Sequence, residues 1–401
     1  MTRRASAGPR TRPATAPGAL EGRLTCFAAV APGLEAFALA EARALGLPAN
    51  AEEGGLGWTG DLRSVLTANV GLRIASRVLV RLASFEARSF AELELHARRI
   101  PWSSVVEPAA TVRFRVTCRK SRLYHSDAVA QRLADAVERA VPGTKAIGSS
   151  APDEDSPTHD ASALFVVRFF RDRCVISADA SGELLHRRGY RLATAKAPLR
   201  ETLAAALLAA SGWDGSAPLV DPFCGSGTIP IEAALLGRRI PPGARRTFAI
   251  ERWPGVSRAL VREVRGALER GALPSAPGPI SGSDRDAGAI EGARENAERA
   301  GVGDSISLHV HALSALELPE RTRGWFVTNP PYGVRVGDAV RVRDLWGRFG
   351  RVLRERAPGW RVTLLSPSPV LDRQLRLPTR VVAHTSNGGL PVRIVTAEVP
   401  A

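Results

Sequence analysis

Residues 328–333, TNPPYG, place two consecutive prolines and a tyrosine directly after an apolar run. Asn329 offers a side-chain carbonyl, and Pro330 offers a backbone carbonyl on a residue whose φ is fixed by its ring. Pro331 stiffens the bend, and Tyr332 adds a flat face on which a planar group can stack. An ordinary Pro-Pro turn with a buried tyrosine is the alternative. The four residues indicate a recognition loop with two hydrogen-bond acceptors.

A second candidate lies upstream in PLVDPFCGSGTIPIEAALLG, which reads as a short strand, a tight loop and a helix. Gly225 and Gly227 would let the backbone approach a ligand closely at the N-terminus of the helix. The carboxylate of Asp221, at the end of the strand, repels phosphate and accepts hydrogen bonds from an ammonium group. This favours a cationic amino-acid ligand over a pyrophosphate, and the absence of a following G-K-[ST] excludes a P-loop.

A third candidate is Asp284, which ends the predicted strand GPISGSD and precedes a helix from about Asp286 to Gly301. An acid at the end of the second strand is the expected partner for ribose hydroxyls in a doubly wound sheet. A helix N-cap is the alternative role, because Asp is a leading capping residue. Cys224 lies in the glycine loop, where we interpret it as a small packed residue rather than a nucleophile.

The elements that must position these residues follow a regular order after Pro198. Strands, the glycine loop and helices alternate, which predicts a parallel sheet covered by helices on both faces. The last segment, TRVVAHTSNGGLPVRIVTAEV, predicts two strands around an Asn-Gly turn. The fold class of this half is therefore α/β.

The first half has a mixed pattern that predicts two small α+β units. In the first, the expected elements are strands at 23–30 and 76–87 and helices at 33–46 and 61–71. In the second, Val112, Phe114 and Val116 alternate with arginines, which is typical of a half-buried strand with a cationic outer face. Its other expected elements are helices at 92–100 and 127–141 and two strands around Arg171–Arg173.

The net charge of +15 favours a polyanionic partner such as nucleic acid. Because nearly all of this charge is arginine, GC-biased coding is a competing explanation. The segment LLHRRGYRLATAKAPLR carries no acid, and it is either a solvated linker or an RNA-facing surface. Residues 1–22 contain arginines, prolines and glycines, and they predict a disordered basic tail.

Compartment and metal content are predicted from what the sequence lacks. No apolar run reaches the roughly 18 residues of a membrane span, and no C-x-x-C pair joins the four cysteines. We therefore expect no membrane association, no metal and a reducing, cytoplasmic location.

Two motifs, DPFCGSGTIPIEAALL and TNPPYG, resemble class I S-adenosylmethionine-dependent methyltransferases that act on amino nitrogens. Together with FAAVAPGLEAFALAEARALG, GELLHRRGYRLATAKAPLRETLAAALLAASGW and NGGLPVR, they make the chain after residue 22 similar to the THUMP-domain RNA guanine-N2 methyltransferases of bacteria and archaea. The resemblance implies a ferredoxin-like domain at 23–86, a THUMP RNA-binding domain at 87–181 and a Rossmann-like methyltransferase domain at 182–401. The last would have a mostly parallel seven-stranded sheet with a C-terminal antiparallel hairpin.

The resemblance also implies roles for individual residues. The catalytic loop would be Asn329, Pro330, Pro331 and Tyr332. S-adenosylmethionine would be held by Asp221, Pro222, Gly225, Gly227, Thr228, Asp284 and Ala312. The family usually has an acid that accepts a hydrogen bond from the adenine amino group of the cofactor. At that position this chain has His311. RNA would be bound by Arg113, Arg115, Arg119, Lys120, Arg122, Arg187, Arg188 and Arg191.

The implied reaction is methylation of the N2 amine of a guanosine in RNA. The lone pair of such an amine is delocalised into the ring, and two acceptors could draw its hydrogens out of plane so that it points at the methyl carbon. A paired base must also be flipped out of its stack for this chemistry. We expect 23S ribosomal RNA as the substrate. The alternatives are a tRNA guanosine, adenine N6 in nucleic acid, a protein glutamine, or a non-catalytic RNA-binding adaptor.

Overall fold

The computed structural model describes residues 22–147, 162–191, 199–318, 323–332 and 339–401, so the predicted tail lies almost entirely outside the described residues. The chain divides into two compact units. Unit 1 comprises the described residues of Val80–Gly182 and Ala249–Ser257 together with residues 22–25. Unit 2 comprises Cys26–Leu79, Glu183–Phe248 and Arg258–Ala401. Unit 2 is therefore assembled from three stretches of the chain.

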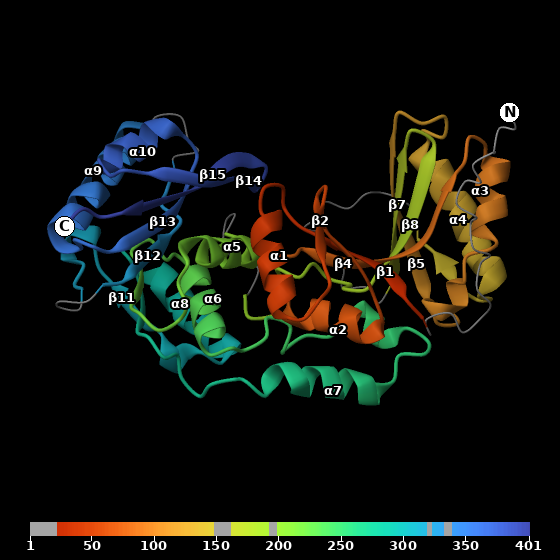
Figure 1. Cartoon of the computed structure of the whole chain (residues 1–401), viewed down its shortest axis with the longest axis horizontal. Coiled ribbons are helices and arrows are strands. Elements are labelled where there is room, and N and C mark those ends of the chain that lie inside the picture. Colours follow the sequence, from red (N-terminus) through yellow and green to blue (C-terminus); the bar gives the residue numbers. More distant parts are fainter. Residues whose placement is uncertain (1–21, 148–161, 192–198, 319–322, 333–338) are drawn as a thin grey trace, which may run out of the picture. The chain divides into compact units, whose positions relative to one another are not determined.

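Unit 1 is a sheet with two helices on one side, α3 (Phe90–Ala97) and α4 (Ser126–Ala140), as Figure 1 shows. Its strands lie in the order β8-β7-β5-β6. Their bounds are Thr111–Arg119 for β5, Lys145–Ala146 for β6, Ala163–Phe170 for β7 and Arg173–Asp179 for β8. Strand β5 is parallel to β6 and β7, and β8 is antiparallel to β7. The α+β prediction for this region is confirmed.

The hairpin between β7 and β8 is closed by Arg171 and Asp172, which have φ values of 51° and 64°. Two consecutive left-handed residues are typical of the tight turns whose twist matches that of the strands. The core beneath the sheet contains Trp102, Phe114 and Phe165. The ring of Trp102 meets that of Phe165 edge-on, at a centroid distance of 5.0 Å. The alternation predicted for β5 is present, because Val112 and Phe114 are buried on this side.

The first part of unit 2 has the strand order β2-β3-β1-β4. Strand β4 (Arg77–Glu86) begins in unit 2 and ends in unit 1. The other bounds are Leu24–Ala29 for β1, Asn50–Glu52 for β2, Gly55–Gly60 for β3, Glu35–Ala44 for α1 and Leu62–Gly71 for α2. Helix α2 begins after Asp61, whose side chain accepts a hydrogen bond from the Ser64 N–H. The β2–β3 hairpin was not predicted from the sequence.

The rest of unit 2 is built on a seven-stranded sheet in the order β11-β10-β9-β12-β13-β15-β14. Strands β9 to β13 are parallel to their neighbours within that group, and β15 is antiparallel to both β13 and β14. The bounds are Leu219–Asp221, Ile280–Asp284, Ser307–Val310, Trp325–Thr328, Arg361–Ser366, Arg380–Asn387 and Leu390–Glu398 for β9 to β15 in numerical order. The predicted Rossmann-like fold, with its C-terminal antiparallel hairpin, is confirmed.

Helices cover both faces of this sheet. Helices α5 (Glu201–Ser211), α6 (Thr228–Gly237) and α8 (Ala287–Ala300) form one layer, in which α5 and α8 each pack against α6. Helices α9 (Ala339–Arg356) and α10 (Pro369–Leu375) pack against each other in a second layer. The core under α9 contains Trp346, Phe349 and Phe326. Helix α7 (Arg258–Glu269) packs against α2.

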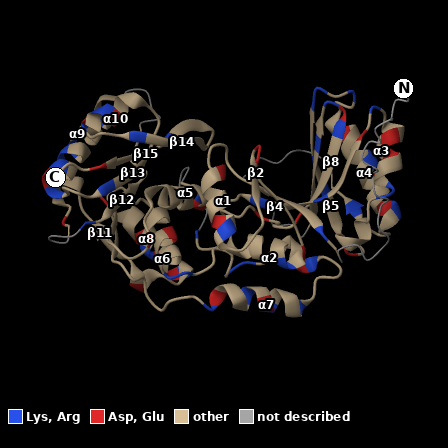
Figure 2. Ribbon diagram, viewed as in Figure 1, with Lys and Arg blue, Asp and Glu red and all other residues tan. Residues whose placement is uncertain are grey.

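Charged residues lie in both units, and Figure 2 shows lysine and arginine along α9 as well as in the unit 1 sheet. In the part of the chain that the structure describes, no helix combines the length and the apolar character that crossing a bilayer would require.

Candidate functional site

The predicted catalytic and cofactor-binding residues lie where four neighbouring strands end. Asp284 ends β10, Asp221 ends β9, and Asn329 directly follows β12. Ala312 follows β11 by two residues. Since these strands are adjacent and parallel in the order β11-β10-β9-β12, their carboxyl ends share one edge of the sheet. Ligands bind at this edge in open α/β folds.

Asp221 is almost fully buried, with 1% of its surface exposed. Its Oδ1 accepts hydrogen bonds from the Thr328 hydroxyl at 2.6 Å and from the Phe223 N–H at 3.2 Å. Burial raises the pKa of this carboxyl to about 7, and the nearby Asp284 adds to the rise, while the hydrogen bonds from Thr328 and Phe223 oppose it. Its other oxygen, Oδ2, has no partner among the described residues. The carboxylate can therefore accept a hydrogen bond from a ligand, and a cationic one would suit it best.

Asp284 ties the second strand to the glycine loop. Its Oδ2 accepts a hydrogen bond from the Gly225 N–H at 3.2 Å, and its Oδ1 accepts one from the Asp286 N–H at 3.0 Å. The N-cap of α8 is Asp286, whose side chain accepts from the N–H groups of Gly288 and Ala289. The alternative role of Asp284 as the helix N-cap is therefore excluded.

The glycine loop has two residues in the left-handed region, Gly225 with φ 51° and Gly227 with φ 82°. A Cβ at Gly225 would meet nothing within 4 Å, whereas one at Gly227 would lie 2.9 Å from the Cβ of Ala293 on α8. Gly225 thus borders open space, while Gly227 allows the loop and α8 to pack closely. Of the other predicted cofactor-binding residues in this loop, Pro222 is buried. Thr228 is the first residue of α6.

Cys224 is also part of the loop. It is 7% exposed, and its backbone N–H donates to the Ser283 carbonyl. Burial raises the pKa of its thiol well above the usual range. A thiol that resists deprotonation is a poor nucleophile, which agrees with its interpretation as a packed residue.

The third strand end carries His311 and Ala312. The His311 N–H donates to the Asp284 carbonyl at 3.1 Å, and its Nδ1 lies 3.2 Å from the Ala312 carbonyl oxygen. Ala312 itself is exposed. No acid therefore occupies the place where the resemblance implies one, and the position next to Asp284 is held by an imidazole.

Besides the bond from Thr328 to Asp221, the TNPPY loop is held by three side-chain hydrogen bonds. The Tyr332 hydroxyl donates to Oδ1 of Asn329 at 2.8 Å, and Nδ2 of Asn387 donates to the same hydroxyl at 2.7 Å. The indole N–H of Trp346 donates to the Pro331 carbonyl at 3.0 Å. The carbonyl of Pro330 has no such partner among the described residues. The two acceptors expected from the sequence, the Asn329 amide and the Pro330 carbonyl, thus retain capacity for a ligand.

The predicted RNA contacts on unit 1 lie along β5 and just after it. Register places Arg113, Arg115 and Arg119 on the sheet face opposite the buried Val112 and Phe114. Arg119, Lys120 and Arg122 are exposed. The Arg113 guanidinium donates to the Ser162 hydroxyl at 2.9 Å, so its position on the face is fixed.

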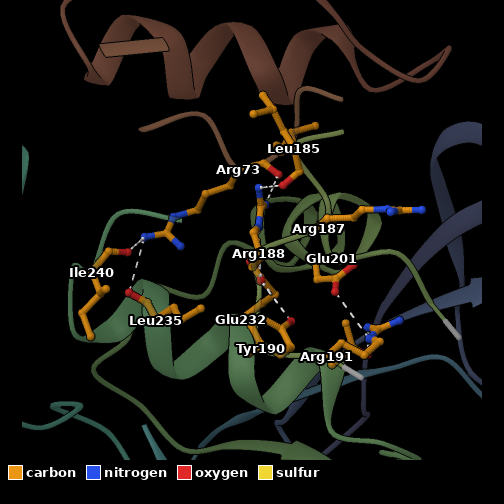
Figure 3. A network of polar contacts seen from close by, with 12 residues as sticks. Arg73, Leu185, Arg187, Arg188, Tyr190, Arg191, Glu201, Glu232, Leu235 and Ile240 are labelled. Carbon is orange, nitrogen blue, oxygen red and sulfur yellow. Dashed lines mark hydrogen bonds and ion pairs between the residues drawn. The ribbon is translucent and has the colours of Figure 1, made fainter. Parts of the chain in front are cut away.

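The predicted contacts at 187–191 lie in a different environment, which Figure 3 shows. Arg188 is 5% exposed, and its guanidinium donates to the carbonyls of Leu185 and Arg73, at 2.5 Å each. Its Nε lies 3.5 Å from Oε1 of Glu232. A buried guanidinium with these partners cannot reach RNA, so the predicted role of Arg188 is wrong.

Arg191 and Arg187 are also paired with acids. Arg191 lies 3.4 Å from Glu201 and donates to the hydroxyl of Thr228 at 2.5 Å. The side chain of Arg191 is only 13% exposed, so it braces the start of α6 instead of facing solvent. Arg187, which is more exposed, lies 3.6 Å from Glu183. Among the described residues of this segment, Arg188 and Arg191 belong neither to a solvated linker nor to an RNA surface, while the role of Arg187 stays a prediction. Lys196 of the same segment lies outside the described residues.

Three residues of the site were not identified from the sequence. Asn387 and Trp346 contact the TNPPY loop from β14 and α9, and Asn296 of α8 donates to the Ser226 carbonyl in the glycine loop at 3.0 Å. The NGG stretch was noted as part of a hairpin and of the family resemblance, without a role for Asn387. Within the described residues, no cluster of His, Cys, Asp and Glu could hold a metal ion.

Comparison with known proteins identifies three domains. A model described as an RMKL-like methyltransferase domain matches residues 188–395. An RlmL ferredoxin-like domain matches 25–79, and a THUMP domain matches 87–179. These ranges do not test the predicted bounds 23–86, 87–181 and 182–401, which stay predictions.

Individual relatives span nearly the whole chain. A Synechocystis protein named "Putative RNA methyltransferase slr0064" is 32% identical over 93% of this chain and 96% of its own length. The crystal structure of a "predicted N6-adenine-specific DNA methylase" from Listeria monocytogenes has a TM-score of 0.82 at 31% identity, over 94% of this chain and 97% of that one. The structure of SMU.472, described as "a putative methyltransferase complexed with SAH", has a TM-score of 0.82 at 29% identity, over 94% and 99%.

The family model alone covers more than half of the chain, and the matched sheet carries both the glycine loop and the TNPPY loop. The chain belongs to the RMKL-like methyltransferase family, with RlmL ferredoxin-like and THUMP domains preceding its methyltransferase domain.

Proposed function

We propose that this protein transfers a methyl group from S-adenosylmethionine to the exocyclic N2 amine of a guanosine in RNA, with 23S ribosomal RNA as the substrate. The observation that carries the proposal is the hydrogen bond between Thr328 and Asp221. It joins the residue before Asn329 to the acid at the head of the glycine loop. A cofactor held by that loop and an amine held by Asn329 would therefore meet within one site.

The residues at the strand ends fit S-adenosylmethionine. Oδ2 of Asp221 can accept a hydrogen bond from an ammonium group, and Asp284 at the end of β10 suits ribose hydroxyls. The open space beside Gly225 admits the ligand close to the backbone, and the start of α6 favours a carboxylate. When bound, the cofactor supplies a methyl carbon on a positively charged sulfur.

The TNPPY loop suits an amine as the methyl acceptor. Oδ1 of Asn329 accepts from Tyr332 with one lone pair and can accept an amine hydrogen with the other. The Pro330 carbonyl can accept the second hydrogen. Two such contacts would turn the amine's lone pair toward the methyl carbon, so positioning supplies most of the rate enhancement. No strong base is required, because an alkylated amine cation loses its proton readily.

The outer face of the unit 1 sheet suits single-stranded RNA. Register brings Arg119 and Arg173 to either side of Phe170, which is 52% exposed. The guanidinium carbon of Arg171 lies 5.1 Å from the centre of the Phe170 ring. Exposed aromatic rings beside arginines stack unpaired bases and bind their phosphates. The matched THUMP domain supports RNA over DNA.

A second candidate is adenine N6 methylation, which the name of the Listeria structure favours. Asn329 and Pro330 would serve either amine, because both are exocyclic amines conjugated to a purine ring. The relative named as an RNA methyltransferase and the arginines of unit 1 favour an RNA substrate. The same arginines disfavour a protein glutamine, since a peptide needs no phosphate-binding face. A tRNA guanosine is the nearest alternative substrate.

Mass spectrometry of nucleosides tests the proposal. Ribosomal and transfer RNA would be isolated from a deletion strain and from strains complemented with the natural chain or with Asn329→Ala. We expect N2-methylguanosine to disappear at one position of 23S RNA and to return only with the natural chain. Loss of N6-methyladenosine would overturn the guanine assignment, and loss from tRNA would overturn the ribosomal one. If the protein were a non-catalytic adaptor, complementation with the natural chain and with Asn329→Ala would give the same level of methylation.

A further inference from the structure

Asn387 ends strand β14, directly before the turn residues Gly388 and Gly389 of the C-terminal hairpin. It is 55 residues from Tyr332 in sequence, yet its side-chain amide donates to the Tyr332 hydroxyl at 2.7 Å. That hydroxyl donates in turn to Oδ1 of Asn329 at 2.8 Å. The three side chains form a hydrogen-bond chain that ends on the proposed acceptor.

The direction of this chain is decided at one end. The Tyr332 hydroxyl has a single proton, so it can donate to only one of the two asparagines. When Asn387 presents its NH₂ group, the hydroxyl donates to Asn329, and the carbonyl oxygen of Asn329 must face it. When residue 387 presents an acceptor, the hydroxyl donates there, and Asn329 must present its NH₂ group instead. In that second state the Asn329 oxygen is turned away.

Two further observations support a fixed direction. Burial raises the pKa of Tyr332, so the phenol keeps the proton that it must donate. The backbone of Gly33 approaches strand β14 closely, because a Cβ at Gly33 would lie 1.9 Å from the carbonyl oxygen of His384. Asn387 lies on a strand that is paired with β15 up to the Asn387–Leu390 pair, and its side chain has no other hydrogen-bond partner among the described residues.

We propose that Asn387 is a positioning residue whose amide NH₂ sets the direction of this hydrogen-bond chain and thereby keeps the Asn329 oxygen available to the substrate amine. The proposal rests on the proposed function, because it assigns Asn329 as an acceptor for an exocyclic amine. It does not depend on which purine carries that amine.

Kinetics of Asn387→Asp and Asn387→Ala test the proposal. Asp has the shape of Asn but, when ionised, can only accept, so it reverses the chain, whereas Ala only removes one donor. We expect kcat to fall about 100-fold for Asn387→Asp, the lower end of the cost of losing a preorganised contact. For Asn387→Ala we expect a fall of about tenfold, the value of one ordinary hydrogen bond. The KM for S-adenosylmethionine should stay unchanged. Ser386→Asp, at the exposed neighbouring position, controls for an added negative charge.

A double-mutant cycle separates positioning from packing. In a Tyr332→Phe background the hydrogen-bond chain is absent. Asn387→Asp should then lower kcat no more than Asn387→Ala does. A merely structural role would leave the ranking of the two variants unchanged. An Asn387→Ala loss equal to or greater than the Asn387→Asp loss in the natural background would overturn the proposal.

An NMR measurement tests the direction of the hydrogen bonds without any methyl transfer. Selective ¹⁵N labelling of asparagine gives five side-chain amide signals. Asn387→Asp should shift the amide protons of Asn329, which become hydrogen-bond donors to Tyr332, and Ser386→Asp should not. An unmoved Asn329 signal would overturn the proposal even if no RNA substrate were found, whereas a shifted signal with no methyl transfer would contradict only the proposed function.

Discussion

Two arginine-rich segments, 113–122 and 187–191, read alike in the sequence and differ in the folded protein. The first lies on and beyond β5, where Arg119, Lys120 and Arg122 are exposed. The second is packed inside unit 2, where Arg188 is 5% exposed and Arg191 is paired with Glu201. The difference teaches that the density of arginines does not identify a binding surface. The acids that reach a segment from elsewhere in the fold decide its role.

The physical reason lies in the cost of burying charge. A guanidinium can leave water only if its N–H groups and its charge are matched. Unit 2 supplies the carbonyls of Leu185 and Arg73 and the carboxylate of Glu232 around Arg188. On the open face of the unit 1 sheet, Arg119, Lys120 and Arg122 form no ion pair with a described residue, so their charges remain available to a polyanion.

The largest expected effect is on stability. Arg188→Ala leaves Glu232 buried without its cationic partner, and we expect the free energy of unfolding to fall by about 3–5 kcal/mol. Urea denaturation followed by circular dichroism measures this. Arg187→Ala is the matched control, because its partner Glu183 is partly exposed, and it should cost less than about 1 kcal/mol. Equal losses would remove the contrast between buried and exposed arginines within this segment.

The buried segment should also make stability depend on pH. Burial raises the pKa of Glu201 to about 7, although Arg191 opposes the rise. Because the folded state then binds a proton more tightly than the unfolded state, this contribution to stability is complete below about pH 4.5 and is lost as the pH rises through 7. Its slope cannot exceed about 1.4 kcal/mol per pH unit. Glu201→Gln should remove this slope in urea titrations between pH 5 and about 8; an unchanged slope would contradict the assignment.

Substitution of Phe170, which lies beside Arg119, tests whether the exposed arginine-rich segment is part of an RNA-binding surface. Phe170→Ala should weaken binding of single-stranded RNA by about 1–3 kcal/mol, the usual value for one stacked base, and should leave the unfolding free energy nearly unchanged. Fluorescence anisotropy with a labelled oligonucleotide measures the affinity. Leu95→Ala, on α3 and also 52% exposed, is the matched control. If both variants bind RNA as the natural chain does, the outer sheet face is not the RNA surface.

The smallest expected effect is on salt dependence. Arg119→Ala should reduce the slope of log affinity against log salt by about 0.7, the value for one phosphate contact on a single strand. Arg132→Ala on α4, where Arg132 is paired with Glu94, should leave the slope unchanged. The same anisotropy measurement at several salt concentrations checks both. An identical slope for Arg119→Ala would exclude a phosphate contact at this position.

Local signals in the sequence predicted much of the methyltransferase fold. Gly212 and Gly301 end α5 and α8 in the left-handed conformation, and Asp286 begins α8. These residues act on their own neighbours, so their effect can be predicted without knowing the fold. The β2–β3 hairpin was missed because β2 consists of the exposed residues Asn50–Glu52, which give no apolar alternation.

Contacts between distant residues could not be predicted in the same way. The burial of Arg188 depends on Glu232 and on the Arg73 carbonyl, which is 115 residues away. The role of Asn387 depends on a hairpin that returns beside the TNPPY loop. The strand-end positions of Asp221 and Asn329 were predictable, because parallel strands bring their carboxyl ends to one edge. The tertiary partners of each side chain were not.

Because unit 2 is assembled from separated stretches of the chain, its parts leave the ribosome at different times. The guanidinium of Arg73 donates to the carbonyl of Ile240 at 2.6 Å, across 167 residues of chain. At a synthesis rate of about 5–20 residues per second, Arg73 leaves the ribosome about 8–33 seconds before that partner. The largest stretch of unit 1, Val80–Gly182, is encoded in between and can begin to fold during this delay, although Ala249–Ser257 of the same unit follows later. Until then the first stretch of unit 2 lacks this partner, and apolar surface that stays exposed in an incompletely folded unit is prone to aggregation.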